Sequence, residues 1–256
     1  MYGWKNKDKM INIEGKLADG TQLYGWKSDP PKTPFAPDYA HYITYKEIFS
    51  EEECKEWDTY LLEQEQIHLE KYVTSSGDGR TGLGDNSITS RYGSFNVLRF
   101  DFHLVSKLKT EIFNGIKTVL SVSDNTNWQE TFYANAWFNV MRKTEFMDVH
   151  THGYHMHSFY GFHVSISARE TATSYYHPTK FQSEGCHIPN KIGYLTLFPN
   201  FVPHGVSGNR YDTPRISIAG DVKTSTWLND SSATAVNLKD LSVEIGTYNN
   251  NSELQE

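Results

Sequence analysis

The stretch 131–141 (TFYANAWFNVM) constrains the fold most, because its side chains alternate in character with a period of two residues. One face would carry Phe132, Ala134, Ala136, Phe138 and Val140. The other face would carry Tyr133, Asn135, Trp137, Asn139 and Met141. An apolar face suits a packed core, whereas a face with two asparagines is typical of a pocket wall. The stretch therefore predicts a strand between a core and a pocket.

Further short strands are expected near 160–168, 173–177, 192–198, 202–207 and 215–222. Several short strands with turn residues between them favour a β barrel or sandwich. Two helices should flank it. The first, near 51–66, begins with a capping box at Ser50 and Glu53, and the second, near 103–120, has apolar residues at every fourth position. We predict a mainly β fold with flanking helices (α+β).

The 256 residues suit one elaborated β domain, which we place at 41–223. Residues 1–40 show no clear periodicity and are predicted to be an irregular N-terminal arm with at most one short strand. Residues 224–256 are polar and asparagine-rich, so we predict a C-terminal tail or an appended element. The stretch 74–95 contains five glycines and should form a long loop, either a lid over a site or a plain surface loop.

The net charge of −7 argues against nucleic acid as a partner, because phosphates need a basic surface. Cys54 and Cys186 are too few for a disulfide framework and indicate a reducing compartment. No apolar run approaches the length of a membrane span, and the first residues lack the apolar core of a signal peptide. We therefore expect a cytoplasmic protein without a membrane partner.

Two histidines one residue apart, His150 and His152, are followed by a third at His204. On a strand, residues i and i+2 share a face, so His150 and His152 would point the same way, as would Asp148. Histidine is the commonest transition-metal ligand, although a single histidine is more often a core or surface residue. The three together indicate a metal site.

Arg215 and Ser217 share one face of a predicted strand that begins eleven residues after His204. An arginine inside a barrel is costly to bury unless an anion pairs with it. A carboxylate beside the metal would meet that need, while a surface ion pair with Asp212 is the plainer alternative. The alternation favours a place for an acidic cosubstrate.

At these positions the chain resembles the 2-oxoglutarate- and Fe(II)-dependent oxygenases, and more narrowly the branch found in marine bacteria and phages. The resemblance covers residues 133–222 and is weaker at 48–62. It rests on the stretches AWFNVMRKTEFMDVHTH, HSFYGFHVSIS, GYLTLFPNFVPHGV and RISIAGD. It implies a double-stranded β-helix (a cupin-like jelly roll). It also implies iron on His150 and His204, and 2-oxoglutarate on Arg215 and Ser217.

His152 departs from the family pattern, since most members carry a carboxylate ligand at its position. The narrower branch has a similar His-x-His, and three imidazoles can hold Fe(II). Alternatively, Asp148 supplies the carboxylate, but it precedes His150, whereas the family's acid follows. We therefore favour His150, His152 and His204 as the catalytic metal ligands. Asn139 and Asn135 are further candidates for cosubstrate binding, and His155, His157 and His163 are weaker candidates for outer or substrate contacts.

The resemblance implies an enzyme that uses Fe(II), 2-oxoglutarate and O₂ to hydroxylate a C–H bond, with release of succinate and CO₂. A second hypothesis is a non-catalytic binding or virion-associated protein on the same barrel. A third is a three-histidine dioxygenase that does not use 2-oxoglutarate, in which Arg215 binds the substrate's own carboxylate.

Overall fold

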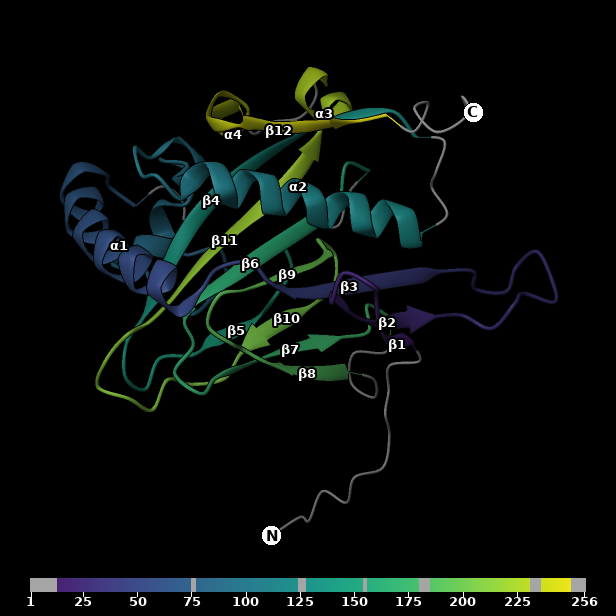
Figure 1. Ribbon diagram of the computed structural model, residues 1–256, viewed down its shortest axis with the longest axis horizontal. Helices are drawn as coiled ribbons and strands as arrows, with labels where there is room; N and C mark the ends of the chain where they lie inside the picture. The colour runs from purple at the N-terminus through teal and green to yellow at the C-terminus, as the bar shows by residue number, and fades with distance from the viewer. Residues whose placement is uncertain are drawn as a thin grey trace, which may run out of the picture.

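The computed structural model describes residues 13–74, 77–123, 128–153, 156–179, 185–230 and 236–249. Two antiparallel β-sheets form the centre of the molecule (Figure 1). The large sheet has eight strands in the order β1-β2-β3-β9-β6-β11-β4-β12, and the small sheet has four in the order β5-β10-β7-β8. Within the described helices, none is long and apolar enough to cross a membrane.

The strands from β4 to β11 pass back and forth between the two sheets and form the jelly roll. The large sheet receives β4 (Glu130–Met141), β6 (Tyr160–Ser167), β9 (Tyr194–Pro199) and β11 (Arg215–Thr224). The small sheet receives β5 (Met147–His150), β7 (Ala172–Tyr176), β8 (Gly185–Pro189) and β10 (His204–Val206). This strand order is that of a double-stranded β-helix, so the fold class is as predicted.

Two helices cover the outer face of the large sheet (Figure 1). Helix α1 (Glu51–Lys71) begins at the capping box predicted from Ser50 and Glu53, in which each residue bonds the backbone of the other. Helix α2 (Val105–Val122) buries Leu108, Ile112 and Ile116. Both helices start where the spacing predicts, and they pack on the apolar face of β4 and its neighbours.

The N-terminal region is more regular than the predicted irregular arm. Strands β1 (Ile13–Lys16) and β2 (Gln22–Lys27) form a hairpin, and β2 pairs with β3 (Ala40–Glu47). The hairpin turn is fixed by Asp19, whose carboxylate accepts hydrogen bonds from the backbone and hydroxyl of Thr21. Short, half-exposed strands at a sheet edge carry a weak alternation, which is why the sequence pattern misses them.

The C-terminal region adds two short helices and a strand, and the strand extends the other edge of the large sheet. Helices α3 (Ser225–Asn229) and α4 (Val236–Leu241) precede β12 (Val243–Tyr248), which pairs with β4. The amide of Asn135 donates to the carbonyl of Leu238, so this asparagine holds α4 rather than lining a pocket. The domain limits at 41 and 223 stay a prediction.

The remaining described segments include two 3-10 helices, η1 (Ile88–Arg91) and η2 (Val97–Arg99), between α1 and α2. Cys186 and His187 lie on β8, which pairs with the preceding strand β7.

Candidate metal centre

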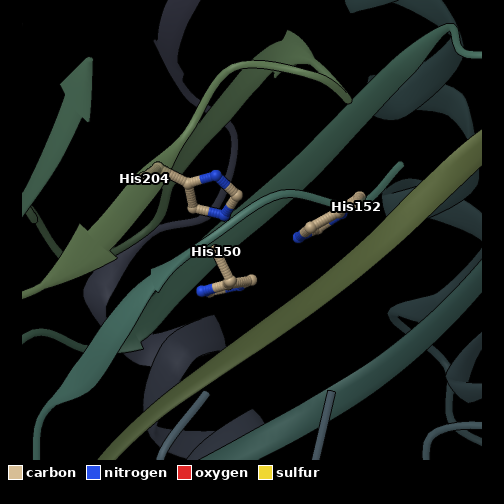
Figure 2. A group of neighbouring side chains, drawn as sticks. All are labelled: His150, His152 and His204. Carbon is tan, nitrogen blue, oxygen red and sulfur yellow. The ribbon is translucent and has the colours of Figure 1, made fainter. Parts of the chain in front are cut away.

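His150, His152 and His204 come together between the two sheets (Figure 2). His150 is the last residue of β5 and pairs with His204, the first residue of β10. His152 lies just beyond the end of β5, where its backbone N–H donates to the carbonyl of Asn200 at 2.9 Å. One ligand nitrogen from each ring lies within 4.8 Å of the others. The structure thus brings the three histidines of the sequence motif into one group.

The Nδ1 atom of each ring already has an oxygen partner. His150 Nδ1 lies 2.7 Å from the carbonyl of Asp148, and His204 Nδ1 lies 3.0 Å from the carbonyl of Val202. His152 Nδ1 lies 2.8 Å from Oδ1 of Asp221. Because a carbonyl or an ionised carboxylate only accepts, each Nδ1 carries the proton and donates. The lone pair of each imidazole is therefore on Nε2, free to bind a metal.

Two of the rings, His150 and His204, are held neutral, as metal binding requires. Burial, with the neighbouring His152, lowers the pKa of His150 to about 4. Burial, followed by His150 and His152, lowers the pKa of His204 well below its ordinary value. Near pH 7 neither ring has to lose a proton before it coordinates a cation.

Asp148, the alternative carboxylate ligand, is not part of this group within the described residues. Its side chain is exposed and faces Gly82, where an added Cβ would lie 2.7 Å from Oδ2 of Asp148. The backbone N–H of Asp148 donates to the carbonyl of Thr81, which ties this part of β5 to the glycine-rich loop. The shared face expected for Asp148 and His150 on a strand is therefore not used for ligation.

Arg215 is 1% exposed and is held by hydroxyl groups. Nε donates to Oγ1 of Thr171 at 3.1 Å, and Nη1 donates to Oγ of Ser217 at 3.2 Å. Burial lowers the pKa of Arg215 to about 10, so the group still carries its charge at pH 7. In the described part of the chain, no carboxylate forms an ion pair with it. A buried cation of this kind favours an anionic ligand.

The histidines and Arg215 line the same cavity of about 140 Å³ between the sheets. Alternate residues of β11 face it, from Arg215 and Ser217 to Ala219 and Asp221. Trp137 and Asn139 face it from β4, so the asparagine-bearing face of 131–141 is in part a pocket wall as predicted.

Asn139 connects η1 to the polar wall of the cavity. Its Oδ1 accepts a hydrogen bond from the hydroxyl of Thr89 at 2.8 Å, and its amide donates to Oγ of Ser217 at 3.4 Å. Ser217 in turn accepts from Arg215. Asn139 therefore orients the serine, and a direct contact with a cosubstrate stays a prediction.

The described part of the long loop 74–95 lies at the cavity. Its lining residues are Asp78, Gly79, Thr81, Thr89 and Tyr92. The carboxylate of Asp78 accepts from the backbone N–H groups of Arg80 and Gly84, which fixes the turn. The loop therefore borders the site, as a lid would, while its residues 75 and 76 lie outside the described residues.

Two further residues line the cavity: His163, one of the weaker candidates from the sequence, and Asp221, which the sequence pattern did not single out. His163, on β6, is buried with its Nε2 at 2.7 Å from the Tyr175 hydroxyl, while its Nδ1 has no hydrogen-bond partner among the described residues. Burial, with the charge of Arg215, lowers the pKa of His163 to about 3. Asp221, the partner of His152, shares the face of Arg215 and Ser217 at two-residue spacing. That spacing was the available signal for Asp221. His157 lies apart, beside Asp230, and His155 lies outside the described residues.

No family model matches the chain, and no curated protein matches it significantly. Similar solved structures include the non-heme alpha ketoglutarate dependent carbocyclase SnoK from nogalamycin biosynthesis, at 11% identity and a TM-score of 0.47, covering 71% of this chain and 79% of that one. A Pseudomonas putida prolyl-4-hydroxylase has 9% identity and a TM-score of 0.46, covering 71% and 91%. AviO1 from Streptomyces viridochromogenes Tue57 has 10% identity and a TM-score of 0.46, covering 75% and 90%. With TM-scores below 0.5, these likenesses assign no role to any residue here.

Proposed function

We propose that the protein is an Fe(II)- and 2-oxoglutarate-dependent oxygenase that hydroxylates a C–H bond of its substrate. One observation carries the proposal: three imidazoles with free Nε2 atoms converge in the same cavity as a buried arginine that has no acidic partner among the described residues. A metal explains the first half of this arrangement, and an acidic cosubstrate explains the second.

The donor set fits iron. Neutral imidazole suits Fe, Zn, Cu and Ni, and three nitrogen ligands leave further coordination positions open. A structural zinc site would be closed by a fourth protein ligand, and no fourth histidine, cysteine or carboxylate joins the group in the described ranges. His150, His152 and His204 would therefore hold a metal that can also bind a cosubstrate.

The other end of the cavity fits a carboxylate. The guanidinium of Arg215 supplies the charge, and the hydroxyl of Ser217 adds a hydrogen-bonding group. The buried Nδ1 of His163, which has no described partner, supplies another polar atom to the same cavity. 2-Oxoglutarate carries one carboxylate for the arginine and a second, beside its keto group, that can approach the metal.

When bound, iron and 2-oxoglutarate supply the oxidising chemistry, in which O₂ and 2-oxoglutarate yield succinate, CO₂ and the hydroxylated product. The chain's own residues bind and orient. Arg215 fixes one end of the cosubstrate, the three histidines fix the metal, and Phe198 and Trp137 make part of the wall apolar. The loop with Asp78 and Tyr92 borders the space left for the substrate.

An anaerobic titration tests this proposal. Fe(II) and 2-oxoglutarate added to the protein should give the weak metal-to-ligand visible band. Arg215→Ala should abolish that band, while Arg210→Ala, which removes an exposed arginine outside the cavity, should keep it. No band with the wild-type protein, or a band unchanged in Arg215→Ala, contradicts the proposal.

A second measurement separates the alternatives. Succinate formation on exposure to air supports the use of 2-oxoglutarate, whereas O₂ consumption without succinate favours a three-histidine dioxygenase whose substrate pairs with Arg215. Bound zinc without turnover favours a binding protein. The narrower branch of marine bacteria and phages and the cytoplasmic location stay predictions.

A further inference from the structure

His152 differs from the other two histidines in what lies behind it. His150 and His204 each bond a backbone carbonyl through Nδ1, whereas His152 bonds the carboxylate of Asp221 at 2.8 Å. His152 is also the histidine that lies beyond the end of its strand. We propose that Asp221 is a positioning residue of the metal site, which aims Nε2 of His152 at the metal and supplies from behind this ring the negative charge that the three neutral ligands lack.

The carboxylate is itself held in place. Oδ2 of Asp221 lies 3.6 Å from Nζ of Lys223, which is two residues further along β11 and only 5% exposed. Nζ of Lys223 in turn lies 5.5 Å from the centre of the Trp227 ring. Because Asp221 lies on a paired strand, β11, and its carboxylate is held by a buried lysine, it has little freedom to move away from His152.

The neighbouring strand leaves room for this pair. Gly161 on β6 is opposite Asp221 in the β6–β11 ladder. A Cβ at Gly161 would lie 2.9 Å from Nδ1 of His152, which is too close for an ordinary contact. The ring of His152 also packs against Trp137 and Phe198, at centroid distances of 5.6 and 5.4 Å. Backbone, ring contacts and carboxylate thus all define one orientation of this imidazole.

This arrangement has a chemical consequence. A carboxylate that accepts the Nδ1 proton increases the electron density of the imidazole and strengthens its bond to a metal. A three-histidine site leaves more positive charge on the metal than a site with a carboxylate ligand. Asp221 would offset part of that difference through the hydrogen bond, without occupying a coordination position.

Asp221→Asn is the decisive variant, because it keeps the size of the side chain and removes its charge. The probe is Co(II) alone, added to metal-free protein, with the visible spectrum of Co(II) as one readout. The second readout is the fluorescence of Trp137, which lies beside His152. Because the chain has six tryptophans, the variant Trp137→Phe shows how much of the fluorescence change comes from Trp137. Asp212→Asn, an exposed carboxylate paired with Lys143 at the surface, is the matched control.

We expect Asp221→Asn to bind Co(II) about fivefold or more weakly and to change its spectrum, and Asp221→Ala to bind about 10- to 100-fold more weakly. The control should match the wild-type protein. Wild-type affinity and an unchanged spectrum in Asp221→Asn overturn the inference, whether or not Asp221→Ala folds.

The inference rests on the metal site of the proposed function, but the two can fail separately. Co(II) binding that depends on Asp221, without any band from Fe(II) and 2-oxoglutarate, supports the inference and contradicts the oxygenase. The band, combined with Co(II) binding that does not depend on Asp221, does the reverse. A wild-type protein that binds no Co(II) overturns both.

Discussion

The Nε2 atom of His163 lies 2.7 Å from the hydroxyl of Tyr175 in the buried wall of the cavity. Burial raises the pKa of Tyr175 well above its ordinary value, so the phenol keeps its proton and can donate it to Nε2. In the tautomer that accepts this proton, the imidazole N–H is on Nδ1, which is buried without a described partner. We predict this tautomer, in which the pair presents a hydrogen-bond donor next to Arg215.

His163→Phe should weaken 2-oxoglutarate binding about tenfold, since a hydrogen bond to a charged group is worth about 1.5–3 kcal/mol. Fe(II) affinity should change little. Tyr175→Phe should have a smaller effect in the same direction, because the imidazole of His163 can then carry its proton on either nitrogen. The measurement is an anaerobic titration of the visible band with 2-oxoglutarate. His187→Phe, at an exposed position of β8, is the control, and equal affinities in all variants would contradict this role.

Arg215→Met should make the metal-free protein more stable, by about 1–3 kcal/mol in the free energy of unfolding. The physical reason is that the wild-type protein buries a cation that is paired with hydroxyls rather than with a carboxylate. Denaturant unfolding of both proteins without ligand measures the difference. The same variant should lose the stabilisation that 2-oxoglutarate and Fe(II) give to the wild type. A less stable metal-free variant would show that Arg215 already has its counter-charge.

The metal-free protein should lose stability as the pH falls from about 6.5 toward 4. The folded-state pKa is about 4 for His150 and about 3 for His163, both because of burial. The unfolded chain takes up protons at these residues in this range and the folded protein does not, so lower pH favours unfolding. Each histidine contributes a slope of up to about 1.4 kcal/mol per pH unit.

Unfolding free energies at pH 7, 6 and 5 measure this slope. His163→Gln should reduce the slope by the contribution of one histidine. An unchanged slope in His163→Gln would mean that this ring titrates normally in the folded state. Saturating metal should hold His150 and His204 unprotonated and shift the loss of stability to lower pH.

Asn139→Leu should destabilise the protein by about 1–3 kcal/mol, because it leaves the buried hydroxyl of Thr89 without its acceptor. Thr89→Val removes the same hydrogen bond from the other side, and the double variant should cost less than the sum. If Asn139 also contacts 2-oxoglutarate, Asn139→Leu weakens cosubstrate binding and Thr89→Val does not. Thermal unfolding and the anaerobic titration together decide between a supporting and a direct role.

Much of the core was predictable, because its strands and helices have strong local patterns. The two faces of 131–141, the capping box at Ser50 and the strand after Arg215 all carry a periodicity that neighbouring residues define. Strands β1, β8 and β12 were not predictable, since they are short and owe their order to pairing: β1 and β8 with an adjacent strand of the chain, and β12 with the distant β4. Their sequences resemble loops, and the partner strand decides their conformation.

The sequence by itself determined which residues could form the site: His150, His152 and His204 as ligands and Arg215 with Ser217 as an anion group. Their types and two-residue spacings depend on local chain geometry alone. Only the tertiary structure decided what surrounds them. It turned Asp148 toward the glycine-rich loop, brought Asp221 behind His152, and left Arg215 buried with hydroxyl partners at the cavity. These contacts join strands far apart in the chain, so they depend on sheet register and burial, which no local pattern encodes.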